Sequence, residues 1–184
     1  MTGSSYSVFN ATVDIVASPG KALDEIKQHT AWLWWPLLIS LLLACGLMVY
    51  YYSWVDFPWL VEETVRQIPA EVRAERAEAT RNFMSQGSTT WMTVAGIVIV
   101  TFIIYLIQSV YLHLANKLVT GADIRFGQWF SFSAWTAFVG VFGVIAAFVT
   151  IFMADSNQLS NQSRQVLSMT SLFIHASAGD PWFT

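Results

Sequence analysis

The sequence predicts an all-α, polytopic helical membrane protein with three transmembrane helices and with amphipathic helices at the membrane surface. Of its 184 residues, 55% are hydrophobic and 11% are charged, whereas a soluble domain carries about 25% charged residues. A soluble protein of this length could not hide so much apolar surface, because small domains have a high ratio of surface to volume. Three long apolar runs, residues 32–54, 91–114 and 130–153, form the predicted spans.

The rest of the composition excludes several classes of function. The net charge is −3, so the chain lacks the basic character of a protein that binds nucleic acid. Its one cysteine, Cys45, lies in an apolar run, so neither a disulfide framework nor a thiolate metal site is expected.

The N-terminal tail, residues 1–31, contains one predicted amphipathic helix. Ser18 has the side chain of a helix N-cap, and Pro19 suits the first helical position. Leu23 and Ile26 form the apolar side of this helix, and the opposite side carries Lys21, Asp24, Glu25, Lys27 and Gln28. We expect the helix to lie along the membrane surface.

The first span, residues 32–54, is long enough to cross a bilayer. At about 1.5 Å per residue it reaches roughly 34 Å, against a hydrocarbon core of about 30 Å. Aromatic side chains crowd both of its ends, as in the aromatic belts of membrane interfaces. They are Trp32, Trp34 and Trp35 at one end, and Tyr50, Tyr51, Tyr52, Trp54 and Trp59 at the other.

Residues 55–90 are the one strongly charged stretch, and we expect two helices that are separated at Pro69. Glu62 with Arg66, and Glu78 with Arg81, fall at the spacing of helical ion pairs. This charged hairpin is either a solvated element packed on the membrane surface or the bundle, or a helix that binds a partner protein.

The second span, residues 91–114, is rich in valine and isoleucine. A helix is still expected, because in lipid every backbone polar group must be satisfied within the segment. The lack of alternation between apolar and polar residues disfavours a β-barrel. Gln108 is the most polar side chain in a span; it is a candidate for interhelical hydrogen bonding or, as the alternative, for a transport pathway.

A short loop, residues 115–129, leads to the third span at 130–153. Gly121 and Gly127 in the loop indicate a tight turn. The span itself is rich in small residues, which let helix backbones approach closely in membranes. We expect one face of it to pack against another span, and its members are Ala137, Gly140, Gly143 and Ala147.

No residues form a recognisable catalytic, cofactor-binding or metal-binding motif. His29, His113 and His175 have no carboxylate or cysteine at ligand spacing, and no zinc-protease, phosphate-loop or nucleophile-elbow pattern occurs. We therefore expect no enzyme activity, no cofactor, no bound metal and no identifiable small-molecule substrate.

The distribution of positive charges favours a cytoplasmic N-terminus. The two sides of the membrane carry nearly equal totals, four on one side (Lys21, Lys27, Lys117 and Arg125) and five on the other (Arg66, Arg73, Arg76, Arg81 and Arg164). The flanks of the first span often decide orientation, and the two lysines of the tail lie closest to it.

Three features together resemble the bacterial branch of the YIP-domain family, relatives of the Ypt/Rab-interacting membrane proteins. They are the lead-in from Ser18 to Leu23 followed by Trp34, Trp35 and Pro36; the exit of the second span from Leu114 to Gly121 followed by Phe126; and the spacing of the apolar segments. The resemblance covers nearly the whole chain, so we expect a single YIP-like membrane domain over residues 1–184.

Two departures limit what the resemblance implies. The eukaryotic members have an Asp-Leu-Tyr-Gly-Pro signature before their spans, which this chain lacks, so Rab binding is not transferred. Family members also look like five-span proteins, whereas residues 154–184 form a polar tail in which 166–176 are too short and too polar to cross. We expect either a chain truncated before further spans or a short version whose last segment rests on the membrane.

The resulting hypothesis is a non-enzymatic scaffold or organising factor in the bacterial inner (cell) membrane. Its expected partners are the lipid bilayer and other membrane proteins, or a second copy of the chain. The alternative is a component of a membrane transporter or channel.

Overall fold

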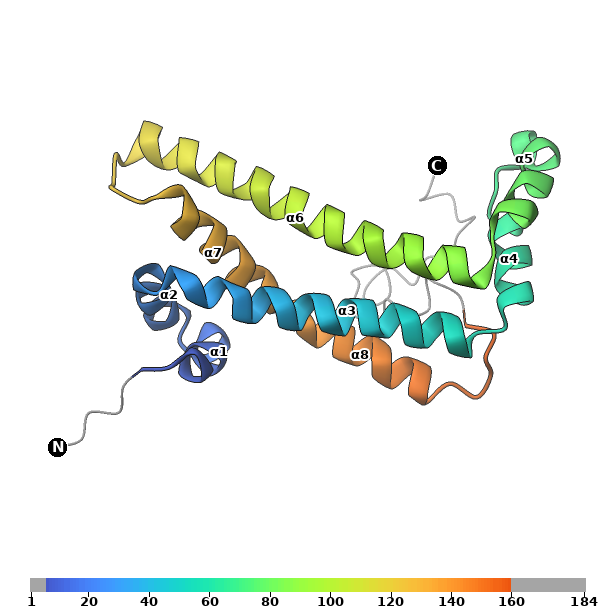
Figure 1. Cartoon of the computed structure of the whole chain (residues 1–184), viewed down its shortest axis with the longest axis horizontal. Coiled ribbons are helices and arrows are strands. Elements are labelled where there is room, and N and C mark those ends of the chain that lie inside the picture. The colour runs from blue at the N-terminus through green and yellow to red at the C-terminus, as the bar shows by residue number, and fades with distance from the viewer. Residues whose placement is uncertain (1–5, 160–184) are drawn as a thin grey trace. The chain divides into compact units, whose positions relative to one another are not determined.

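The computed structural model describes residues 6–159, and every regular element within them is a helix (Figure 1). Three segments are long and apolar enough to cross a membrane: Thr30–Trp54, Gln86–Val119 and Phe126–Phe152. The predicted all-α class and the three predicted spans are therefore confirmed. Most of the predicted polar tail, with His175 and Arg164, lies outside the described residues.

The chain divides into two compact units, and each of the three spans contributes to both. The first unit contains residues up to Leu43 together with Gly96–Val141. Its elements are α1 (Val8–Ala17), α2 (Pro19–Gln28), a 3₁₀ helix (Thr30–Leu33), the start of α3 (Trp34–Trp54), the end of α6 (Gln86–Val119) and α7 (Phe126–Phe138).

The second unit contains Ala44–Ala95 together with the residues from Phe142 onwards. Its elements are the end of α3, α4 (Phe57–Arg66), α5 (Ala70–Phe83), the start of α6, and α8 (Val141–Phe152) apart from its first residue. The core of this unit is formed by Leu47, Tyr51, Tyr52, Val55, Leu60, Ala147 and Ile151.

Helix α6 is longer than the second span predicted from hydropathy, which covers residues 91–114. It has 34 residues, or about 51 Å at its helical rise, so polar turns extend it beyond the apolar run at both ends. At its start, the Thr90 hydroxyl donates to the Gln86 carbonyl. At its end, Gly121 has a positive φ of 63° and its N–H donates to the Asn116 carbonyl. A glycine in this conformation ends a helix without steric cost, as the sequence indicated.

The third span is interrupted, whereas a single helix was expected over residues 130–153. Helix α7 ends at Phe138 and α8 begins at Val141. Between them, the Gly140 N–H donates to the Ala137 carbonyl, three residues back, at 2.9 Å. A Cβ atom at Gly140 would lie 3.1 Å from that carbonyl oxygen. A side chain at Gly140 would therefore require this carbonyl to shift by a few tenths of an ångström, so glycine suits the tight turn.

Candidate functional site

The α1–α2 hairpin packs on α7 in the first unit. Ala11 and Ile15 from α1, and Ala22 and Ile26 from α2, form a buried cluster around Trp135, which has 0% of its surface exposed. The N-cap residue Ser7 starts α1 by accepting a hydrogen bond from the Asn10 N–H. Figure 1 shows both short helices beside the first turns of α3. The N-terminal hairpin thus packs on Trp135, a residue of the third span.

A three-residue polar cluster joins α1 to α2. Asp14 accepts a hydrogen bond from the Tyr6 hydroxyl at 3.0 Å and an ion-paired one from Lys21 at 2.8 Å. The Lys21 bond, followed by the Tyr6 bond, holds the pKa of Asp14 below its usual range. Burial and the hydrogen bond to Asp14 raise the pKa of Tyr6 to about 12. Asp14 is therefore charged at neutral pH, and its Oδ2 atom accepts bonds from both donors.

Two further hydrogen bonds attach the hairpin to the spans. The Trp35 indole N–H, in the first turn of α3, donates to the Thr12 hydroxyl at 3.0 Å. The Gln128 amide, in the first turn of α7, donates to the Lys27 carbonyl at 2.8 Å. Each of these bonds links a short N-terminal helix to the first turn of a span helix, so the hairpin has a defined position against the spans of this unit.

Small polar residues bring α6 and α7 together. The hydroxyl oxygens of Ser109 and Ser133 lie 3.2 Å apart, and both side chains are fully buried. Each hydroxyl also has a carbonyl acceptor in its own helix, Tyr105 for Ser109 and Trp129 for Ser133. Because a hydroxyl carries one proton, the bond between the helices competes with these local bonds. The Ser109–Ser133 bond therefore does more to fix where the two helices meet than to increase the stability of their contact.

A small cleft lies between α2 and α7. Its volume is about 180 Å³, with Ile26, Trp129 and Phe132 among its apolar walls and with Asp24 and Lys27 from α2 beside them. Pockets that enclose a small-molecule ligand usually have volumes of about 300–1,000 Å³. We therefore assign no substrate site to this cleft.

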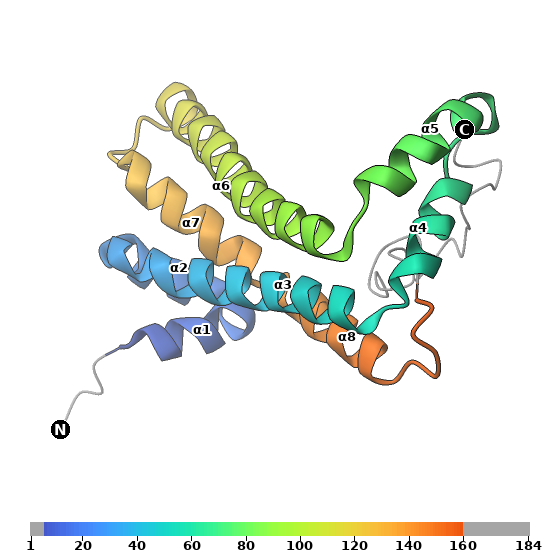
Figure 2. The ribbon, with the colours of Figure 1, turned by 45° about the vertical axis from the view of Figure 1, so that its right-hand side comes forward.

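The charged stretch forms two helices in the second unit, α4 and α5, joined by a turn at Pro69 (Figure 2). Arg81 of α5 donates two hydrogen bonds to the Glu62 carboxylate of α4, at 2.7 and 2.9 Å. This bond lowers the pKa of Glu62 and raises that of Arg81. Arg73 donates to the Ile68 and Arg66 carbonyls at the end of α4. The two helices are thus held together mainly by arginine side chains.

The ion pairs of this hairpin differ from those that sequence spacing indicated. Glu62 pairs with Arg81 across the hairpin, and Arg66 pairs with Glu63 at 3.2 Å. The local partners suggested by spacing were Arg66 for Glu62 and Glu78 for Arg81. The planar guanidinium of Arg81 makes two parallel bonds with one carboxylate, and this bidentate contact is stronger than a single-bond pair.

The predicted helix-packing residues do not lie on one continuous helix. Ala137 lies in the last turn of α7 and Gly140 in the turn that follows it, and both are exposed. Gly143 is half-exposed on α8, whereas Ala147 is buried in the core of the second unit. Gln108 is half-exposed on α6. A role for these residues in contacts with another protein stays a prediction.

Two features were missed at the sequence level. Helix α1 was not expected, although Ser7 followed by Val8, Ala11 and Ile15 has the N-cap and the spacing of an amphipathic helix. The contact of Ser109 with α7 was also not predicted, although Ser109 is a polar residue within an apolar run. Both signals are weak in the sequence, because the roles of α1 and of Ser109 depend on contacts with another helix.

The histidines of the described region contact backbone and aromatic groups. His29 Nδ1 lies 3.1 Å from the Glu25 carbonyl, and its ring stacks on Trp32 with centroids 4.3 Å apart. His113 meets the Phe126 ring edge-on at 6.1 Å. Within residues 6–159, no three His, Cys, Asp or Glu side chains gather as metal ligands would.

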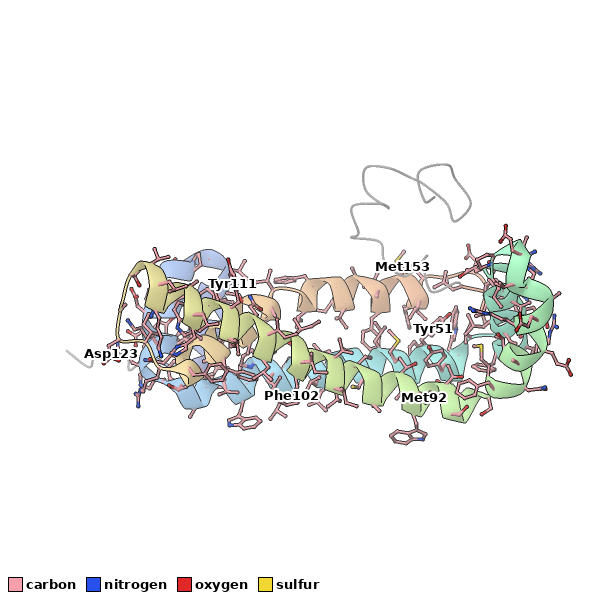
Figure 3. The ribbon with its side chains drawn as sticks, turned by 90° about the horizontal axis from the view of Figure 1, so that it is seen from above. Tyr51, Met92, Phe102, Tyr111, Asp123 and Met153 are labelled. Carbon is pink, nitrogen blue, oxygen red and sulfur yellow. The ribbon has the colours of Figure 1, made fainter. Side chains whose placement is uncertain are left out.

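Large apolar side chains cover the outside of the spans. Along α6, the side chains of Met92, Phe102 and Tyr111 are all exposed (Figure 3). Asp123 lies in the polar loop that follows this helix (Figure 3). Apolar surface of this extent, ending at a polar loop, is typical of a helix that faces lipid.

Comparison with known proteins agrees with this architecture. The family model of the Yip1 domain matches residues 13–181. The chain belongs to the Yip1 domain family. The match begins within α1 and includes every later helix of the described residues, so the N-terminal hairpin and the α4–α5 hairpin of this Yip1 domain lie almost wholly inside the matched region. No curated protein and no solved structure matches the chain.

Proposed function

We propose that this Yip1-domain protein is a non-enzymatic membrane scaffold, which organises partner proteins through contacts of its spans and of the α4–α5 hairpin. No catalytic step and no cofactor belong to this proposal. The family membership and the apolar helices support the membrane location, and the hairpin supports the scaffold role.

The observation that carries the proposal is the state of α5. This helix has 14 residues and buries none of them, although isolated helices of about 12–15 residues are only marginally stable in water. Its position is nevertheless fixed, because Arg81 donates two hydrogen bonds to the Glu62 carboxylate and Arg73 donates one to the Arg66 carbonyl at the end of α4. A helix that is held in place but packs little of its own surface is suited to present that surface to another protein.

The charge on α5 indicates the chemistry of the partner. Glu71, Glu75 and Glu78 are exposed and recur at intervals of four and three residues, so they lie on one face of the helix. In the described part of the chain, none of the three takes part in an ion pair, whereas Arg81 faces α4. We propose that this acidic face meets a basic surface on the partner, which favours specificity and rapid association more than affinity.

Photo-crosslinking in cells tests the scaffold role. A photoreactive residue at Ala79, which is exposed on α5, should give one or a few discrete adducts, with a homodimer counted among them. Replacing Glu71, Glu75 and Glu78 together by glutamine should remove those adducts, because the charges are lost while helix propensity changes little.

The matched control is a photoreactive residue at Gln28, which is exposed on the polar side of α2. Adducts at Ala79 that survive the three glutamine substitutions would refute the acidic docking face. A complete lack of discrete adducts, in a variant that is inserted and helical, would refute the scaffold role.

The proposed location is the bacterial inner membrane, with the N-terminus in the cytoplasm. This location rests on the resemblance to the bacterial branch and on Lys21 and Lys27 before the first span. In a Cys45→Ser background, a cysteine at Ala122 should label from the cytoplasm and one at Ala77 from the outside. Labelling of the Ala77 position from the cytoplasm would invert the orientation and make cytosolic proteins the partners of the hairpin.

A further inference from the structure

Helix α1 has two apolar faces, and only one of them packs against the protein. Ala11 and Ile15 point into the cluster around Trp135. On the outer side, Phe9, Val13 and Val16 are 63%, 66% and 55% exposed and recur at intervals of four and three residues. They form a continuous apolar stripe along the helix. We propose that α1 lies within the acyl-chain layer of the membrane and that this stripe contacts lipid chains.

The contacts of α1 place it below the membrane surface. The polar loop with exposed Asp123 and Arg125 precedes α7, and Trp135 comes five residues after Phe130, the first residue of the apolar run at 130–153. At helical rise this distance is about 8 Å, which places Trp135 inside the nearer half of a hydrocarbon core of about 30 Å. The cluster around Trp135 also includes Phe138, still further along α7. Helix α1 therefore packs on a part of α7 that lies inside the hydrocarbon layer, below the headgroups.

A second cluster in the same unit supports this depth. Leu37 of α3, Tyr105 of α6 and Ala134 of α7 form one buried group, so they lie at a common level in the three spans. Trp35 lies only two residues before Leu37, and it bonds Thr12 and meets the Phe9 ring at 4.9 Å. Contacts on two spans thus place α1 close to the level of this group.

The polar groups of α1 are satisfied in a way that suits a lipid environment. Ser7 caps the first turn, and the Ser18 N–H donates to the Asp14 carbonyl at the end. Unpaired backbone groups in hydrocarbon cost several kcal/mol each. The one charged residue of the helix, Asp14, is paired with Lys21 and Tyr6. The Lys21 ammonium group is itself held at Asp14, 2.8 Å from its carboxylate, so the two opposite charges of the cluster offset each other.

The size of the stripe favours lipid over a second protein. A stable protein interface buries about 800 Å² on each partner, and three side chains of a ten-residue helix fall short of that area. The stripe also adjoins lipid-facing surface, because Phe9 contacts Trp35 and the neighbouring Trp34 and Leu38 on α3 are exposed apolar side chains. Lipid chains can cover this whole surface without any specific fit.

Spin-label accessibility in vesicles tests the placement of α1. The full chain, in a Cys45→Ser background, carries a nitroxide at Val13 or, in a second variant, at Phe9. Two matched positions calibrate the measurement: Leu42, an exposed residue of a span in the same unit, and Glu25, on the polar side of α2. We expect the ratio of collisions with oxygen to collisions with a water-soluble nickel complex at both α1 positions to be nearer to that at Leu42 than to that at Glu25, and several-fold above that at Glu25.

Two results would overturn the placement. A ratio at Val13 and Phe9 equal to that at Glu25 would put α1 in water. Protection of both positions from oxygen and from nickel would mean that protein, such as a second copy of the chain, covers the stripe. Circular dichroism of each labelled variant establishes that it is folded before the ratios are compared.

Discussion

Replacing Trp135 by alanine should release the α1–α2 hairpin from α7. Trp135 is fully buried and contacts Ala11 and Ile15 of α1 and Ala22 and Ile26 of α2. A buried Trp→Ala change typically costs about 3–5 kcal/mol. We expect about 3 kcal/mol here, because lost van der Waals contacts account for most of the energy of helix packing in lipid. At about 1.4 kcal/mol per factor of ten, the hairpin should open roughly 100-fold more often.

Cysteine labelling measures this opening directly. Ala22 has none of its surface exposed, so in an Ala22→Cys, Cys45→Ser background a maleimide reacts only when the hairpin opens. The labelling rate should rise roughly 100-fold with Trp135→Ala. Trp34→Ala is the matched control, since it deletes the same side chain at a site that is 56% exposed, and it should leave the rate nearly unchanged. Equal rates for the two alanine variants would show that Trp135 does not hold the hairpin.

Three further outcomes follow from the described contacts. The Glu62–Arg81 pair stabilises the hairpin above the ordinary carboxyl pKa of about 4.3 and is lost as pH falls through the lowered pKa of Glu62. A spin label on α5 should therefore become more mobile in acid, and Glu62→Gln should be mobile at neutral pH as well. Ser109→Ala should lower the free energy of unfolding in detergent by only about 0.6 kcal/mol or less. The bond of its hydroxyl to Ser133 competes with the local bond to the Tyr105 carbonyl, so little is lost. Gly143→Ala should weaken self-association in a crosslinking assay if the predicted packing face is correct, whereas Gly46→Ala should not.

The spans could be predicted because the information for them is local. Bilayer thickness sets the length of a span, and lipid requires an apolar composition. A run such as residues 32–54 can therefore be recognised from the sequence alone. The ends of the helices were less accurate. Helix α6 continues to Gln86 and Val119 because a helix ends where its capping bonds are made, and these can lie in water beyond the apolar run.

The contacts between helices could not be predicted, because they depend on which elements meet. Arg81 has Glu78 three residues away on its own helix, yet it binds Glu62. The hairpin places both oxygens of the Glu62 carboxylate opposite the guanidinium group, so that two hydrogen bonds form. In the same way, α1 contains Asn10, Thr12 and Asp14, three residues that lower its apparent apolar character. Each of these side chains has a partner outside the helix: Ser7 for Asn10, Trp35 for Thr12 and Lys21 for Asp14.

The small residues of the third span have at least two different roles. Ser131, Ser133 and Ala134 are fully or almost fully buried, and Ser133 and Ala134 contact the two other spans of the first unit. At Gly143 of the second unit, by contrast, an added Cβ would meet no atom of the described residues within 4 Å, and the same holds for Gly46, which also lies in the second unit. Contacts within the described part of this unit therefore give no reason for a glycine at either position, and helix propensity disfavours glycine at both. Comparing Gly143→Ala with Gly46→Ala in the self-association assay then separates a contact that Gly143 makes with a second molecule from ordinary tolerance of glycine in lipid.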